Sequence, residues 1–164
     1  MSRRKSKKRK NKRRGRPRGL QKALRQRVKE NFPHQKVIIG PASDGIKMSE
    51  VLDEFVEPYR KFAETEEAYR KLLTTAIIAW NVTLFPEKER LSRLDELLVT
   101  LPEDVREDGR QIIEELMVRK ERFFSQHRRM IIDFEVADTR GEWHLSVMSV
   151  AGPVSRETKV LRRK

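Results

Sequence analysis

The stretch MIIDFEVADTRGEWHLSVMSV, residues 130–150, decides the fold class because its apolar residues recur at every second position on both sides of a polar turn. A repeat of two is that of a β-strand with one buried face. The predicted inward faces are Met130, Ile132, Phe134 and Val136 before the turn, and Trp143, Leu145 and Val147 after it. Within the turn DTRGE, residues 138–142, Gly141 suits a position with positive φ. The sequence therefore predicts a β-hairpin, which other elements must cover because a lone hairpin is marginally stable in water.

The residues before the hairpin repeat their apolar side chains every three or four positions, which is the pattern of amphipathic helices. Four helices are predicted, over about residues 49–62, 66–85, 86–99 and 100–125. Two hydroxyl side chains, Ser49 and Thr100, are placed to cap the first and the last of them. Pro58 is expected to kink or split the first helix, and Gly109 to weaken or break the last one.

The same repeats predict which side chains enter the core. The second helix carries the longest apolar run, LLTTAIIAWNVTLF at residues 72–85, and is expected at the centre with Trp80 buried. The third is expected to bury Leu91, Leu94, Leu98 and Leu101, and the fourth Val105, Ile112, Ile113, Leu116, Met117, Phe123 and Phe124. The segment KVIIGPASDG, residues 36–45, predicts a short strand followed by a loop. Whether this strand joins the hairpin as a third strand is left open by the sequence. The predicted fold class is α+β: a small helical domain of about four helices with a C-terminal hairpin.

Charge divides the chain into three parts. Residues 1–36 carry a formal charge of +16, residues 37–152 carry −7, and residues 153–164 carry +4. We therefore predict a basic arm (1–36), an acidic α+β core domain (37–152) and a basic C-terminal tail (153–164). A block of like charges repels itself and buries little apolar surface, so the arm is predicted to be disordered alone and to order on a polyanion.

One segment of the arm has a helical pattern. LQKALRQRVKENF, residues 20–32, spaces Leu20, Leu24, Val28 and Phe32 four apart, which gives a basic helix with one narrow apolar stripe that ends before Pro33. The stripe fits either docking on the core or folding along a nucleic acid.

Several classes of protein are disfavoured. The chain has no cysteine, which excludes a disulfide scaffold, a thiolate zinc site and a cysteine nucleophile. Its first residues, MSRRKSKKRK, have no apolar region after the charges, so no signal peptide is predicted, and the 14-residue apolar run is too short for a membrane span. The expected location is cytoplasmic, at the nucleoid or the ribosome, or nuclear in a eukaryote.

Catalytic chemistry has little support in the residues. His34, His127 and His144 lack ligand-spaced partners, so each is predicted to be a surface or structural residue. Asp133 and Glu135 share one face of a strand, as the paired carboxylates of a metal-dependent nuclease would, but alternating charge on an outer strand face is also an ordinary feature. The sequence predicts no catalytic residue, no metal and no cofactor.

The arm contains RRGRPRG, residues 13–19, in which Arg14, Gly15, Arg16 and Pro17 form the R-G-R-P core of an AT-hook. The segment resembles that family of DNA-binding motifs over seven to nine residues, although Arg13 stands where the family has a proline. The resemblance implies binding in the narrow minor groove of A·T-rich DNA: Pro17 favours an extended chain, and Gly15 lets the backbone approach the groove floor. A single hook binds weakly, so flanking cations must supply affinity. The predicted nucleic-acid-binding residues are Lys7, Lys8, Arg9, Lys10, Lys12, Arg13, Arg14, Gly15, Arg16, Pro17, Arg18, Lys22 and Arg25.

The partner predicted from the arm is nucleic acid, with DNA favoured. A ribosome-associated protein remains the alternative, because glycine and proline also let a basic tail thread through folded ribosomal RNA. A nuclear import signal and an anionic membrane surface are further interpretations of the same charges. The acidic core is predicted to bind a protein partner or a second copy of the chain.

Overall fold

The computed structural model describes residues 18–31, 38–39 and 44–152. The elements in chain order are α1 (Arg18–Asn31), β1 (Ile38–Ile39), α2 (Met48–Val56), the 3₁₀ helix η1 (Glu57–Phe62), α3 (Glu66–Val82), α4 (Glu87–Leu98), α5 (Glu103–Phe124), β2 (Arg129–Thr139) and β3 (Glu142–Ala151). The α+β class is confirmed: helices α2 to α5 precede a C-terminal hairpin of β2 and β3.

The sheet has the strand order β1-β3-β2 and is antiparallel throughout. The third strand left open by the sequence is present, because Ile38 and Ile39 pair with Ser149 and Met148. Thr139 pairs with Glu142, so the hairpin turn consists of Arg140 and Gly141, at φ values of 58° and 81°. The positive φ predicted for Gly141 is confirmed. Two consecutive positive-φ residues are typical of the type I′ turn, whose twist matches that of the strands.

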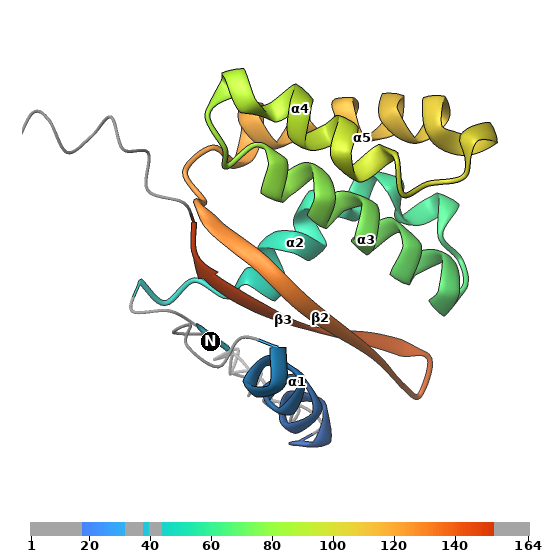
Figure 1. Ribbon diagram of the computed structural model, residues 1–164. Coiled ribbons are helices and arrows are strands. Elements are labelled where there is room, and N and C mark those ends of the chain that lie inside the picture. Colours follow the sequence, from blue (N-terminus) through green and yellow to red (C-terminus); the bar gives the residue numbers. More distant parts are fainter. Residues whose placement is uncertain (1–17, 32–37, 40–43, 153–164) are drawn as a thin grey trace, which may run out of the picture.

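The elements are arranged in layers on the two sides of the hairpin (Figure 1). The blue helix α1 lies against one face of the hairpin, where it contacts β2 and β3. Helices α2 and α3 cover the other face, and α5 packs on α3 with α4 beside it. The sheet is therefore covered on both faces, one of them by a helix from the basic arm.

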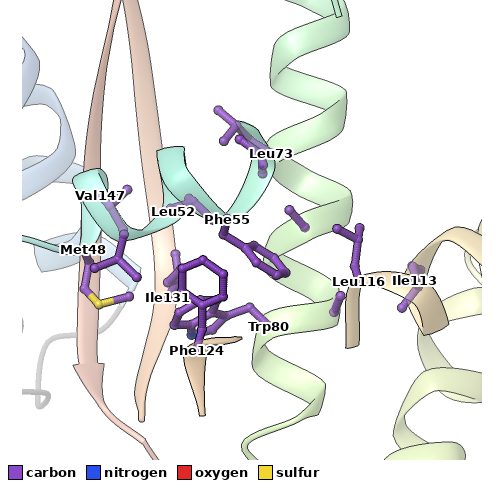
Figure 2. Packing of buried hydrophobic residues seen from close by; sticks show 14 of the residues in the cluster. Met48, Leu52, Phe55, Leu73, Trp80, Ile113, Leu116, Phe124, Ile131 and Val147 are labelled. Atoms are coloured by element: carbon purple, nitrogen blue, oxygen red, sulfur yellow. The ribbon is translucent and has the colours of Figure 1, made fainter. Parts of the chain in front are cut away.

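The main core lies between the sheet and the helices α2, α3 and α5 (Figure 2). Trp80 is completely buried, as predicted, and the Phe55 ring meets it edge-on at 5.4 Å between centroids. Phe124 meets Phe55 in the same way at 5.4 Å. Edge-to-face aromatic contacts favour one arrangement of the rings beyond their apolar burial. Trp143 also joins the core, where it stacks on Tyr69 at 4.9 Å.

A β-bulge in β2 corrects the predicted alternation. The register shifts between Ile131 and Asp133, and Ile131, not Ile132, is buried in the core at 1 % exposure. The physical reason lies on α3. The side-chain amide of Asn81 donates to the Ile131 carbonyl oxygen at 2.7 Å, and its oxygen accepts from the Ile131 amide at 2.9 Å. Beyond the bulge, Phe134 pairs with Val147 and Val136 with Leu145, so the rest of the predicted inward face is confirmed.

Among the predictions about helix ends and breaks, the caps at Ser49 and Thr100 were wrong, the break considered at Gly109 does not occur, and the split at Pro58 is confirmed. Pro58 does split the first helix, because α2 ends at Val56 and the 3₁₀ turn η1 follows. Ser49 lies inside α2, whose N-cap is Lys47. Thr100 does not cap α5, because that helix begins at Glu103 with Pro102 as its N-cap; the Thr100 hydroxyl donates instead to the Leu97 carbonyl oxygen at the end of α4. Helix α5 runs unbroken through Gly109, where the missing side chain admits the Leu101 side chain.

Some residues predicted to be buried lie on the surface. Leu91, Ile112 and Phe123 are 63 %, 46 % and 55 % exposed. The side chain of Val105 is not among those that the structure describes. On α4 the inward position four residues before Leu94 is taken by Arg90, which donates to the carbonyl oxygens of Phe85 and Thr83. The buried stripe of α5 includes Lys120, at 2 % exposure, together with Ile113, Leu116 and Phe124.

Candidate nucleic-acid interface

The described part of the predicted binding site is helix α1. Arg18, Lys22 and Arg25 lie on it, and the side chains of Lys22 and Arg25 are exposed. Arg18 is the first residue of the helix, so its backbone is helical and not part of an extended hook, and its side chain is not described. The other predicted residues lie outside the described residues: Lys7, Lys8, Arg9, Lys10, Lys12, Arg13, Arg14, Gly15, Arg16 and Pro17.

An apolar contact docks α1 on the sheet. Leu24 is 0 % exposed although its described neighbours on the helix are exposed. Met148 is also 0 % exposed, and neither residue belongs to the main core cluster. Met148 pairs with Asp133, which places it on the face of the sheet that α1 covers. Of the two arrangements that the sequence left open, the structure therefore contains the docked one.

Arg27 makes the polar half of this contact. Its Nε lies 2.9 Å from Oδ2 of Asp133, and its Nη2 lies 3.0 Å from Oε2 of Glu135. The same Nη2 donates to the Phe134 carbonyl oxygen at 3.1 Å. A planar guanidinium suits such a multiple contact because its donors diverge in one plane.

Glu135 also forms an ion pair with helix α3, on the other side of the sheet from α1. Its Oε1 accepts from Nη2 of Arg70 on α3 at 2.8 Å, and Arg70 donates further to the Val136 carbonyl oxygen at 2.6 Å. Burial raises the pKa of Glu135, but the hydrogen bond and charge of Arg70, with those of Arg27, outweigh burial and hold the pKa below its usual value. The Glu135 carboxylate thus links α1 to α3 through two arginines.

The pairing of Asp133 and Glu135 on one strand face was predicted, but the arginines that bind them were not. A signal for Arg27 exists in the sequence, since it stands three residues after Leu24 and therefore beside it on a helix. No such signal exists for Arg70, because nothing local relates α3 to the hairpin. The arrangement of these carboxylates serves ion pairing, and among the described residues no group of three or more His, Asp or Glu side chains is placed to hold a metal ion.

The outer side of α1 carries three exposed cations: Lys22, Arg25 and Lys29. We call these three residues the outer stripe. Their spacing of three and four residues places them on one face of the helix. None of them forms an ion pair with another described residue, whereas the exposed Gln26 donates to Glu30 on a different line of the helix. The outer stripe is therefore a line of cations whose charges are not neutralised by the described core.

Two further titratable groups of the described chain, Lys120 and Tyr69, have structural partners. Lys120 donates through Nζ to the carbonyl oxygens of Phe124 at 2.7 Å and His127 at 2.9 Å, which closes the end of α5. Burial lowers the pKa of His127, with a contribution from Lys120. The Tyr69 hydroxyl donates to Asp53 at 2.9 Å. His144 is half-buried on β3, and His34 lies outside the described residues.

Among the described helices, none combines the length and apolar character needed to cross a bilayer. Comparisons of the chain with protein-family models, with curated proteins and with solved structures gave no match.

Proposed function

We propose that this protein is a nucleic-acid-binding accessory protein, and not an enzyme, with DNA as its favoured ligand. The observation that carries the proposal is the separation of charge: +16 in residues 1–36 against −7 in residues 37–152. Binding to a nucleic acid gains free energy from each phosphate neutralised, because condensed counterions are released. An acidic domain gains no free energy in this way. We therefore assign nucleic-acid binding to the arm, and we propose that the core binds a protein partner or a second copy of the chain.

The hook-like residues supply the preference for DNA. Arg14 and Arg16 would lie along an A·T-rich minor groove, where the electrostatic potential is most negative, and Gly15 between them would face the groove floor. Guanine places an amino group in that groove, which gives discrimination of A·T from G·C pairs. The surrounding lysines would contact phosphates without reading sequence. On this proposal the protein acts at the nucleoid, or in the nucleus of a eukaryote.

A ribosome-associated role is the second candidate, and one observation favours it. The hook-like segment is followed directly by a folded basic helix whose outer stripe faces solvent. A basic tail that continues into such a helix also suits a path between helices of ribosomal RNA.

Two variants of the full chain separate the hook from general attraction. Arg16→Ala is expected to weaken binding to an A·T-rich duplex about tenfold to a hundredfold, with little effect on a G·C-rich duplex. Lys8→Ala is the matched control, and it should weaken both duplexes equally and lower the salt dependence by about one charge. Equal losses for both variants on both duplexes would remove the hook from the proposal.

A pull-down from lysate with and without nucleases separates the two candidates. DNA recovery that is lost after DNase treatment supports the first. Co-sedimentation with ribosomes that survives DNase and is lost after RNase overturns the preference for DNA in favour of the second.

A further inference from the structure

We propose that α1, docked on the sheet, is a phosphate-binding ridge that extends the nucleic-acid interface of the arm onto the folded domain. The ridge consists of Lys22, Arg25 and Lys29, and the ligand it takes is the sugar–phosphate backbone of a nucleic acid. This inference rests on the proposed function and adds to it a second, structured contact with Lys29 as a new member.

Docking decides which side of α1 faces outward. Successive residues of an α-helix are rotated by about 100°, so Lys22, Arg25 and Lys29 lie about 100–160° around the helix from Leu24. Leu24 is completely buried, and the three cations are exposed. Arg27 lies on the other side of Leu24, about 60° from it, where it reaches Asp133 and Glu135. The helix thus presents these three cations outward, while Arg27 is neutralised inward.

The same contact removes an obstacle to binding. Asp133 and Glu135 would repel phosphates if the sheet face were bare, but α1 covers this face and Arg27 pairs with both carboxylates. Arg70 binds Glu135 from the opposite layer, which holds this carboxylate against α1. Arg27, Asp133, Glu135 and Arg70 are therefore positioning residues for the ridge.

The position of the ridge in the chain fits one continuous ligand. Helix α1 begins at Arg18, immediately after the hook-like residues 14–17. Lys22 and Lys29 are seven residues apart, a rise of about 10.5 Å along the helix. Three successive phosphates of one strand are two base steps apart, about 6.8 Å along the duplex axis, so a stripe of this length is long enough for its three cations to meet neighbouring phosphates. Contacts of this kind position the protein and carry no sequence information.

The test replaces the outer stripe in the full-length chain and measures binding to a 20-base-pair duplex of mixed sequence over a range of salt concentrations. The triple variant Lys22→Ala, Arg25→Ala, Lys29→Ala is expected to lower the slope of log K against log salt by about 2–3, since each phosphate contact contributes about 0.9. Its thermal unfolding should be unchanged, because the replaced side chains are exposed.

The matched control is Lys61→Ala, Lys71→Ala, Lys88→Ala, which removes the same charge from exposed positions on η1, α3 and α4. Its slope should equal that of the unmodified chain. Equal slopes for the two triple variants would overturn the ridge. If the unmodified chain itself does not bind the duplex, the proposed function is overturned instead.

A second measurement tests whether α1 stays docked when it binds. The methyl resonance of Met148, labelled with ¹³C, reports on the buried contact beneath α1. It should keep its chemical shift at saturation with the duplex. A shift to the value of a solvent-exposed methionine would show that nucleic acid pulls α1 from the sheet, and would overturn the docked ridge.

Discussion

The buried lysine of α5 has a pKa far from that of an exposed lysine. Burial, with the charge of Arg128, lowers the pKa of Lys120 to about 8. Its ammonium lies 4.3 Å from the centroid of the Trp80 ring and donates to two carbonyl oxygens at the end of α5. We expect the ¹⁵N resonance of Lys120 Nζ to titrate with a midpoint near pH 8. A midpoint for Lys120 near 10.5, the ordinary value for lysine, would contradict the effect of its burial.

The lowered pKa of Lys120 also predicts a pH dependence of stability. Between pH 8 and 10.5 the unfolded chain keeps this proton while the folded chain has released it, so the free energy of unfolding rises with pH through this window. Below pH 8 both states are protonated, and the contribution is constant. We subtract the unfolding free energy of Lys120→Met from that of the unmodified chain, each measured by urea denaturation. This difference should be constant from pH 6 to about 8 and should increase above pH 8. A difference that falls with rising pH would have the wrong sign.

Glu135 predicts a pH dependence of the same sign in the acid range, because its pKa is also lowered on folding. Because its pKa is lowered on folding, its contribution to stability is complete above its ordinary value of 4.5 and is lost as the pH falls through its folded value. Glu135→Gln should lower the unfolding free energy by about 1–2 kcal/mol at pH 7, the typical range for a hydrogen-bonded charge that is partly exposed. This difference should shrink as the pH drops below 4.5. Glu115→Gln, at an exposed position of α5, should stay within about 0.5 kcal/mol of the unmodified chain at pH 7.

At the scale of elements, two glycines should respond differently to the same substitution. A Cβ on Gly152 would lie 2.1 Å from the Arg128 carbonyl oxygen, at the point where the end of β3 meets the start of β2. Backbone cannot yield cheaply, so Gly152→Ala should destabilise the protein by about 1–3 kcal/mol. A Cβ on Gly109 would meet only the end of the Leu101 side chain, at 3.2 Å, and alanine favours the helix by about 1 kcal/mol. Gly109→Ala should therefore be neutral or stabilising in thermal unfolding, and equal destabilisation by both would refute the distinction.

The apolar repeats within single helices and strands could be recognised in the sequence. The contacts between different elements could not. The alternation around residues 138–142 identified the hairpin, and the apolar run ending near Phe85 identified the central helix. The bulge at Ile131 depends on Asn81, about fifty residues earlier, which no local pattern reveals. Lys120 was missed on the buried stripe of α5 because a lysine is rarely buried unless carbonyl oxygens are positioned to accept from it.

For the whole molecule, the sequence showed that α1 has an apolar stripe and basic charges, but not which charges face outward. That outcome depends on the other end of the chain, where Asp133 and Glu135 bind Arg27 and leave the outer stripe exposed. The proposed hook rests on the order of its residues alone, because an extended ligand of the kind proposed needs no tertiary structure. Among the described residues, the domain and the proposed site share helix α1, which belongs to the basic arm by charge and to the domain by packing.

This double role predicts that two truncations will separate binding from stability. Deletion of residues 1–17 removes eleven Lys and Arg residues but leaves Leu24 and Arg27 in place. It should abolish most nucleic-acid affinity and change the unfolding free energy by less than about 0.5 kcal/mol. Deletion of residues 1–31 also removes α1, which uncovers Met148 and leaves Asp133 without Arg27. The lost apolar burial and ion pairs should cost about 2–4 kcal/mol more, measured by urea denaturation. Equal stability of the two truncated chains would mean that α1 adds nothing to the domain, and its docking could then not orient the outer stripe.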